Sequence, residues 1–226
     1  MTVVPRSRCF DVVGVRLEGT VAVPEDASGI VLFAHGTGGS RDDERDVRIA
    51  LELNGVRIAT VMVDLLTADE QRIDAATAEL RFDADFLGVR VSAIADVLAA
   101  VDPTSALAGG VLGSHSGAAA ALIAAAARPH WVRAVASRGG RPELAGEFLR
   151  LARAPTLLVV GEYDRPILDL NRQAAQRIAG PSRVAVVRDA GHLFDEPGAL
   201  AAVVDLSRDW FREHLRAGPT TETERA

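Results

Sequence analysis

The sequence predicts an α/β protein with a mostly parallel sheet of about seven or eight strands, helices on both faces and no large cap domain. Two observations lead to this prediction. Several short runs are apolar throughout rather than alternating, which is typical of strands buried on both faces. They are separated by segments long enough for helices, and such strands form a parallel sheet with right-handed crossovers. The runs are Gly29–Ala34, Arg57–Val63, Gly110–Gly113, Val132–Ala136, Thr156–Val160 and Arg183–Val187.

The segments between these runs predict the helices. They are Asp42–Leu53, Phe82–Ala100, Ala118–Arg128, Pro142–Leu151 and Ile167–Ile178. The last long segment, Gly198–Leu215, has an apolar stripe at helical spacing, so we expect it to close the fold as a helix packed on the sheet.

The two ends of the chain differ from this pattern. Phe10–Leu17 and Thr20–Val23 alternate around Gly14 and Gly19, which predicts an antiparallel pair at one sheet edge. Residues 217–226 are polar and are expected to be a disordered tail after a single domain spanning residues 1–216.

The stretch Leu65–Phe86 is the least regular. Thr67 can cap a helix that begins near Ala68, with Glu70 at the capping-box position. Its charged residues are typical of a solvated face. Because it follows a strand end, a small lid over the site is the alternative.

Composition narrows the class of function. The 226 residues carry a formal charge of −6, which argues against nucleic acid or an anionic membrane as a partner. All 25 basic residues are Arg, which removes lysine Schiff-base chemistry. The single Cys9 predicts a reducing compartment and a packed, inert thiol. No secretory segment or membrane span is visible. We expect a cytoplasmic monomer or homodimer that acts on a small molecule without a cofactor.

Candidate functional residues follow the predicted strands, because ligands bind beyond the carboxyl ends of an open parallel sheet. A strand-to-helix turn holds Gly113-Ser114-His115-Ser116-Gly117, and Asp164 and His192 follow later strands. Nucleophile, acid and histidine occur in this order along the chain in α/β hydrolases.

The chain resembles the dienelactone-hydrolase-like small hydrolases of the α/β-hydrolase superfamily. The matching segments are Ala34–Arg41, Val63–Thr67, Leu80–Asp83, Gly113–Ala121, Ser137–Pro142, Val160–Asp164 and Gly191–Pro197. The resemblance implies that Asp164 orients a catalytic His192. It also implies that the loop after His35 lets a substrate approach at Gly36 and donates the backbone N–H of Thr37 to an oxyanion hole.

The sequence departs from the family pattern G-x-S-x-G at the turn. Without a gap, His115 occupies the middle position, and the N–H of Ser116 would join the oxyanion hole. Shifted by one residue, Ser116 occupies the middle and would form an acyl-enzyme with His192 as base. The flanking glycines favour His115, which would then be a general base or a direct nucleophile.

Other groups near the site leave alternatives open. Arg41 and Arg138 could hold a substrate carboxylate, or arginines of this region could pair with Asp42, Asp83 and Glu143. His35, His115, His192 and Asp164 could converge on a metal, but Asp164 is needed to hold His192, so no metal is expected.

Three functions remain. The first is hydrolysis of a small carboxylic ester or lactone. The second is a lyase, isomerase or cyclase that uses His115 or His192 as general base. The third is a catalytically inactive small-molecule binder.

Overall fold

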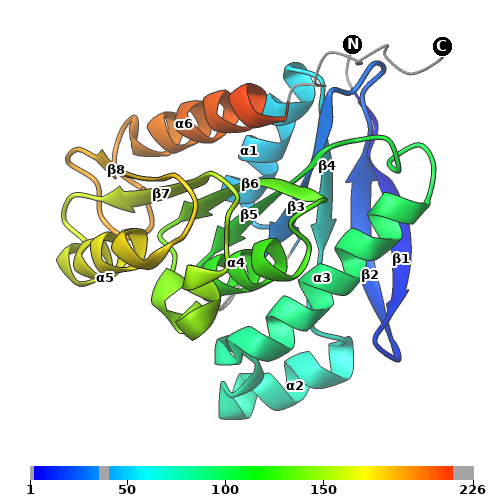
Figure 1. Cartoon of the computed structure of the whole chain (residues 1–226), viewed down its shortest axis with the longest axis horizontal. Coiled ribbons are helices and arrows are strands. Elements are labelled where there is room, and N and C mark those ends of the chain that lie inside the picture. Colours follow the sequence, from blue (N-terminus) through cyan, green and yellow to red (C-terminus); the bar gives the residue numbers. More distant parts are fainter. Residues whose placement is uncertain (1–2, 36–40, 216–226) are drawn as a thin grey trace, which may run out of the picture.

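The computed structural model describes residues 3–35 and 41–215, and these contain one eight-stranded sheet in the order β1-β2-β4-β3-β5-β6-β7-β8 (Figure 1). β2 runs antiparallel to β1 and to β4, and every other neighbouring pair is parallel. The strands are β1 (Arg6–Val12), β2 (Val15–Ala22), β3 (Gly29–Ala34), β4 (Ile58–Val63), β5 (Gly109–Ser114), β6 (Val132–Arg138), β7 (Thr156–Gly161) and β8 (Ser182–Val187). This topology confirms the predicted α/β fold.

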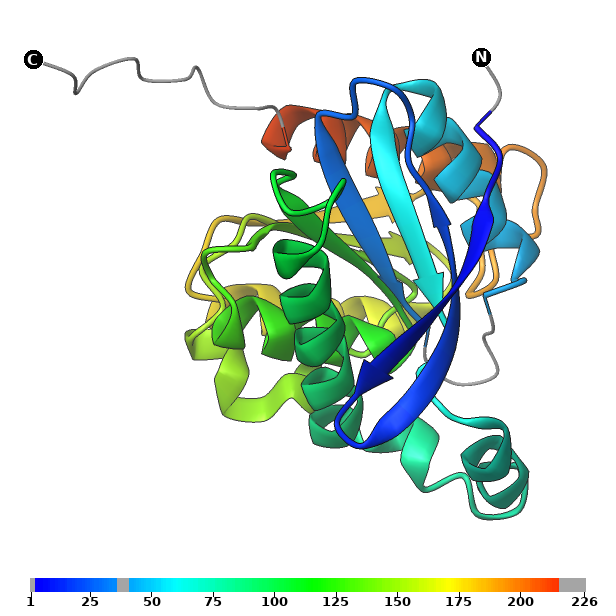
Figure 2. The same cartoon turned by 90° about the vertical axis from the view of Figure 1, so that its right-hand side faces the viewer.

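Helices cover both faces of the sheet. They are α1 (Glu44–Gly55), α2 (Ala68–Thr77), α3 (Ala84–Ala100), α4 (Gly117–Ala127), α5 (Arg165–Arg177) and α6 (Ala199–His214), with 3-10 helices η1 (Leu80–Phe82) and η2 (Pro142–Arg150). α1 and α6 pack on one face and α3, α4 and α5 on the other, as Figures 1 and 2 show. β3, β4, β5 and β7 are therefore buried at every position, which explains their continuous apolar sequence.

The covered faces give two hydrophobic cores. Phe33, Leu112 and Phe211 belong to the core under α1 and α6, and Leu32, Ile94 and Leu122 belong to the core under α3 and α4. The segment between β4 and α3, which contains α2 and η1, is the longest connection beyond the carboxyl ends of the strands in the described residues. These residues therefore contain no large cap domain.

The amino-terminal hairpin differs from the prediction in where it turns. Val12 pairs with Val15, and Val13 and Gly14 form the turn with φ of 50° and 75°. A two-residue hairpin needs positive φ at both positions, and Val is not a usual residue there, so the sequence carries little turn signal. The predicted antiparallel pair at one sheet edge is confirmed, but its bounds were wrong, because Phe10–Leu17 spans this turn and Gly19 lies within β2.

Two further predictions need correction. Pro142–Leu151 is not an α-helix but a 3-10 segment kinked at Gly146, whose φ is 54° and ψ −122°. Cys9 is exposed rather than packed, because on β1 only one face is covered: Phe10 and Val12 point into the core, and Cys9 and Asp11 point out.

Other predictions lie at the ends of elements. The capping box of α2 is confirmed: Thr67 accepts from the N–H of Glu70, and the Glu70 side chain accepts from the N–H of Thr67. The predicted tail at 217–226 lies outside the described residues. Among the residues that are described, no helix is both long enough and apolar enough to span a membrane.

Candidate functional site

The turn between β5 and α4 carries His115. β5 ends at Ser114, α4 begins at Gly117, and His115 has a φ of 52°, in the left-handed region that side chains other than Gly rarely adopt. The turn is tight: a Cβ added to Gly113 would lie 2.4 Å from the carbonyl oxygen of Gly117. Glycine at 113 therefore lets the strand and the helix approach, and the backbone between them bends at His115.

Asp164 and His192 come together beyond the ends of β7 and β8. Nδ1 of His192 lies 2.5 Å from Oδ2 of Asp164. A carboxylate at this distance orients the imidazole and keeps a proton on Nδ1, which leaves Nε2 free to accept a proton from a reactant. The side chain of Asp164 is 12 % exposed and that of His192 is 37 % exposed, so the carboxylate is shielded and the ring is reachable.

The residue after β6 supports the same ring. Gly139 has a φ of 54°, and a Cβ added there would lie 3.5 Å from Cε1 of His192. The backbone of Gly139 thus packs beside the imidazole, and its positive φ would strain any other residue at this position.

His115 and His192 form an edge-to-face pair, with ring centroids 5.0 Å apart and planes at 73°. His115 is half-buried, and within the described residues its buried Nδ1 has no hydrogen-bond partner. Burial, the neighbouring His192 and the Arg138 guanidinium lower the pKa of His115 to about 4. At neutral pH His115 is an uncharged imidazole with a lone pair available for attack or for proton abstraction.

The hydroxyl of Ser116 is bound to another segment of the chain. Ser116 is fully buried, and its hydroxyl donates to the backbone carbonyl of Arg81 in η1. The two neighbouring candidates for the middle of the turn are therefore in different environments: His115 packs against His192, and the hydroxyl of Ser116 is bound to another segment.

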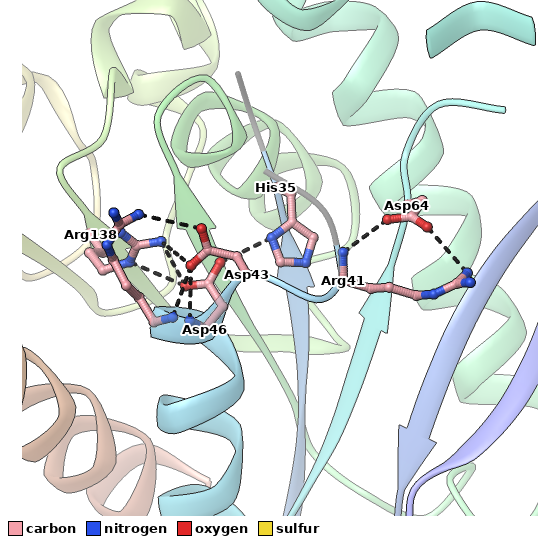
Figure 3. Close-up of polar contacts among 7 residues, drawn as sticks. His35, Arg41, Asp43, Asp46, Asp64 and Arg138 are labelled. Atoms are coloured by element: carbon pink, nitrogen blue, oxygen red, sulfur yellow. Dashed lines mark hydrogen bonds and ion pairs between the residues drawn. The ribbon is translucent and has the colours of Figure 1, made fainter. Parts of the chain in front are cut away.

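A buried charge network lies behind the turn, and Figure 3 shows its members. Asp46, near the start of α1, accepts from Nε and a terminal nitrogen of Arg138 at 3.1 and 2.9 Å, and its other oxygen lies 3.0 Å from Nδ1 of His35. Burial alone would raise the pKa of Asp46, but the charge of Arg138 and the contact with His35 outweigh it and lower that pKa to about 2. Arg138 is 2 % exposed.

Arg41, the other arginine predicted to bind substrate, is also paired with carboxylates. Its backbone N–H donates to Asp64 at 2.9 Å, and its guanidinium lies 3.2 Å from Asp64 and 2.8 Å from Glu18. Of the acidic partners considered from the sequence, Glu143 pairs with Arg141. Substrate binding by Arg41 and Arg138 stays a prediction. Each guanidinium group would have to bind a substrate carboxylate while it is also paired with carboxylates of the protein.

Gly36 and Thr37 lie outside the described residues. The residues on either side of them are held by carboxylates: His35 contacts Asp46, and Arg41 contacts Asp64. Sequence reasoning missed Asp46, which looked like an ordinary acidic residue in the first turn of a helix. Asp64 stood out as a residue that follows a predicted strand, but no role was assigned to it. Within residues 3–35 and 41–215, no group of three or more His, Cys, Asp or Glu side chains is arranged to hold a metal ion.

Comparison with known proteins places the chain in a family, although no family model matches it. A crystal structure of a dienelactone hydrolase from Anabaena variabilis ATCC 29413 superposes with a TM-score of 0.93 at 42 % sequence identity, covering 96 % of this chain and all of that one. The chain belongs to the dienelactone hydrolase family. Est1E from Butyrivibrio proteoclasticus superposes with a TM-score of 0.77 at 13 % identity, over 92 % of this chain and 98 % of that one, and shares the fold.

Curated relatives of this dienelactone hydrolase family member are longer than it is. A Mycobacterium tuberculosis protein with the name "Putative phosphoribosyl transferase" is 45 % identical over 205 residues, which are 91 % of this chain and 45 % of the relative. The chain thus spans about half the length of the curated relatives it matches.

Proposed function

We propose that the protein hydrolyses a small carboxylic ester or lactone at a site formed by His115, His192 and Asp164. The observation that carries the proposal is the placement of two imidazoles: His192 is held by Asp164 at 2.5 Å, and its ring lies against His115. Membership of the dienelactone hydrolase family supports hydrolysis as the reaction.

In this proposal His115 is the nucleophile. The ring nitrogen of His115 that carries no proton attacks the carbonyl carbon, the ester C–O bond breaks, and an acyl-imidazole forms at His115. His192 takes the proton that His115 loses and passes it to the departing alkoxide. Water then attacks the acyl group, His192 accepts a proton from that water and returns it to His115, and the carboxylic acid is released.

The charge state of the site suits these steps. A nucleophilic imidazole must be unprotonated, and the lowered pKa of His115 keeps it so at neutral pH. The backbone N–H of Ser116, at the start of α4, is a candidate oxyanion donor because helix N-termini stabilise negative charge. The burial of the Ser116 hydroxyl, and its bond to Arg81, argue against a serine route.

The same two imidazoles support a second candidate, proton abstraction from a C–H by His115 or His192 in a lyase, isomerase or cyclase reaction. The observation in its favour is again the uncharged His115, which has a lone pair that can accept a proton at neutral pH. In that reaction no acyl group becomes attached to the protein.

One experiment separates these routes. The protein is incubated with a panel of small esters and lactones, quenched in acid and analysed by mass spectrometry, and a parallel sample receives a serine-directed phosphonate. We expect an acyl adduct on His115, no phosphonate label on Ser116, and a loss of at least about 100-fold in kcat/KM for His115→Ala. His130→Ala is the matched control, because His130 is an exposed histidine.

Two outcomes would contradict the proposal. Phosphonate labelling that disappears in Ser116→Ala would establish the serine route. Turnover without an acyl adduct, lost in His115→Ala and confined to substrates with an acidic C–H, would establish the general-base reaction.

Phosphoribosyl transfer, the activity in the name of the longer relatives, is not proposed for this chain. The 205 residues of this chain that match are less than half of the length of those relatives. In addition, 96 % of the chain superposes on a dienelactone hydrolase. We expect no pyrophosphate release from phosphoribosyl pyrophosphate with any base, and such release would overturn this assignment.

A further inference from the structure

Ser116 connects the catalytic turn to a segment that projects from the fold. Its fully buried hydroxyl donates to the carbonyl oxygen of Arg81, although the two residues are 35 positions apart. Arg81 belongs to η1, which follows α2. Figure 2 shows α2 extending past the carboxyl end of β4, the side of the sheet on which ligands bind in this class of fold.

Arg81 is in turn held by Asp74 at the end of α2. The backbone N–H and Nε of Arg81 donate to the two carboxylate oxygens of Asp74 at 3.0 and 2.6 Å, and a terminal nitrogen donates to the Asp74 carbonyl at 2.6 Å. Asp74 is 3 % exposed, so the carboxylate of this pair is shielded from water. Ser116, Arg81 and Asp74 thus form a continuous chain of hydrogen bonds, called the latch below.

The other end of the segment is fixed independently. Arg90 of α3, itself 4 % exposed, binds Glu70 through two bonds of 2.6 and 2.7 Å and donates to the carbonyl of Leu65 at 2.5 Å. Glu70 also closes the capping box with Thr67. Arg90 thus holds the start of α2. Among the side-chain hydrogen bonds of the described residues, those of the latch are the ones that connect the end of α2 and η1 to the His115 turn.

We propose that Ser116 is a positioning residue which, through Arg81 and Asp74, holds residues 68–82 against the His115 turn as a wall of the substrate site, and that this wall limits the size of the acyl group accepted. The proposal rests on the ester hydrolysis inferred above. Ile73 and Phe82 supply apolar surface on this segment: they are 59 % and 47 % exposed, and each is next to a latch residue in sequence. Release of the latch therefore shifts the wall and the room available to an acyl chain.

The test compares acetate and octanoate esters of the same phenol. The measured quantity is the ratio of kcat/KM for octanoate to that for acetate, because a loss of folded protein cancels in a ratio. We expect Asp74→Asn and Ser116→Ala each to change this ratio at least fivefold in the same direction. The double variant should change it no further than either single variant, since both substitutions release the same segment.

Asp69→Asn is the matched control. It makes the same change of charge on the same helix, but the Asp69 pair with Arg72 is exposed. We expect it to leave the ratio within twofold. Amide hydrogen exchange supplies a readout that needs no turnover: peptides covering residues 68–82 should exchange faster in Asp74→Asn and in Ser116→Ala, and unchanged in Asp69→Asn.

The outcomes distinguish the latch from the proposed reaction. Faster exchange with an unchanged ratio overturns the wall. Unchanged exchange in both latch variants overturns the latch itself. Phosphonate labelling at Ser116 overturns both the latch role and the histidine nucleophile. If the parent protein hydrolyses no ester, the proposed reaction fails and with it the acyl-size wall, while hydrogen exchange still decides whether Ser116 holds the segment.

Discussion

The imidazole of His115 is surrounded by groups that disfavour its protonated form. Burial removes water from the ring, His192 lies at its edge, and Arg138 sits on the neighbouring strand, where it pairs in register with Ser114. All three lower the pKa, to about 4. Between pH 6.5 and 4, the unfolded chain binds a proton at residue 115 that the folded chain does not. This residue therefore reduces the free energy of unfolding as the pH falls through that window.

An NMR titration of the His115 ring tests this account. We expect a midpoint near pH 4 in the parent protein and a higher midpoint in His192→Gln, because that variant removes one of the charges that disfavour protonation of His115. A midpoint that does not move in His192→Gln would show that His192 does not contribute, and that burial and Arg138 account for the lowered pKa of His115.

How far the sequence could locate this site depends on the residue. The order of His115, Asp164 and His192 along the chain was visible, and the structure brings the three side chains together. The sequence left open whether His115 or Ser116 occupies the bend, because each has a small residue two positions before it and two positions after it. The difference lies in a backbone φ of 52° and in a hydroxyl bond to a residue 35 positions away, neither of which is written in local sequence.

At the scale of elements, the ion pair between Asp46 and Arg138 joins α1 to the end of β6. Both side chains are buried, and the residues are 92 positions apart. Removing one member of a buried pair leaves an uncompensated charge in the interior. We expect Asp46→Ala to lower the free energy of unfolding by about 3–5 kcal/mol, and the double variant Asp46→Leu/Arg138→Met to lose less.

The control for this prediction is Asp96→Ala, which breaks the exposed pair of Asp96 with Arg128 and should cost about 1 kcal/mol or less. Urea unfolding at pH 7 measures both. Because the pKa of Asp46 is lowered to about 2, its contribution to stability is full above pH 4 and is lost as the pH falls toward 2. Equal costs for the two single variants would contradict the buried-pair account.

Elements were predicted best where burial determines the sequence. β3, β4, β5 and β7 could be recognised from continuous apolar runs because both of their faces are covered. The hairpin turn at Val13 and the kink at Gly146 were missed, since Val is unusual at positive φ and a 3-10 segment shares its apolar spacing with a helix.

At the scale of the whole molecule, one sheet separates two cores, and each core has its own tryptophan. Trp131 packs against the core under α3 and α4, and Trp210 packs against the core under α1 and α6. Because every central strand contributes side chains to both cores, we expect them to unfold together. Trp131→Phe and Trp210→Phe each leave a single tryptophan as reporter. In each variant, the urea midpoint measured by fluorescence should coincide with the midpoint measured by circular dichroism. Separate fluorescence and dichroism transitions within either variant would show that the cores unfold independently.

The exposed thiol of Cys9 has a practical consequence. It lies on the edge strand β1, and three strands separate β1 from β5, which leads into the His115 turn. As the chain contains no second cysteine, a maleimide dye or an affinity handle attaches at one defined point per molecule. Such a label reports on tumbling or on self-association, and it is attached away from the turn that carries His115.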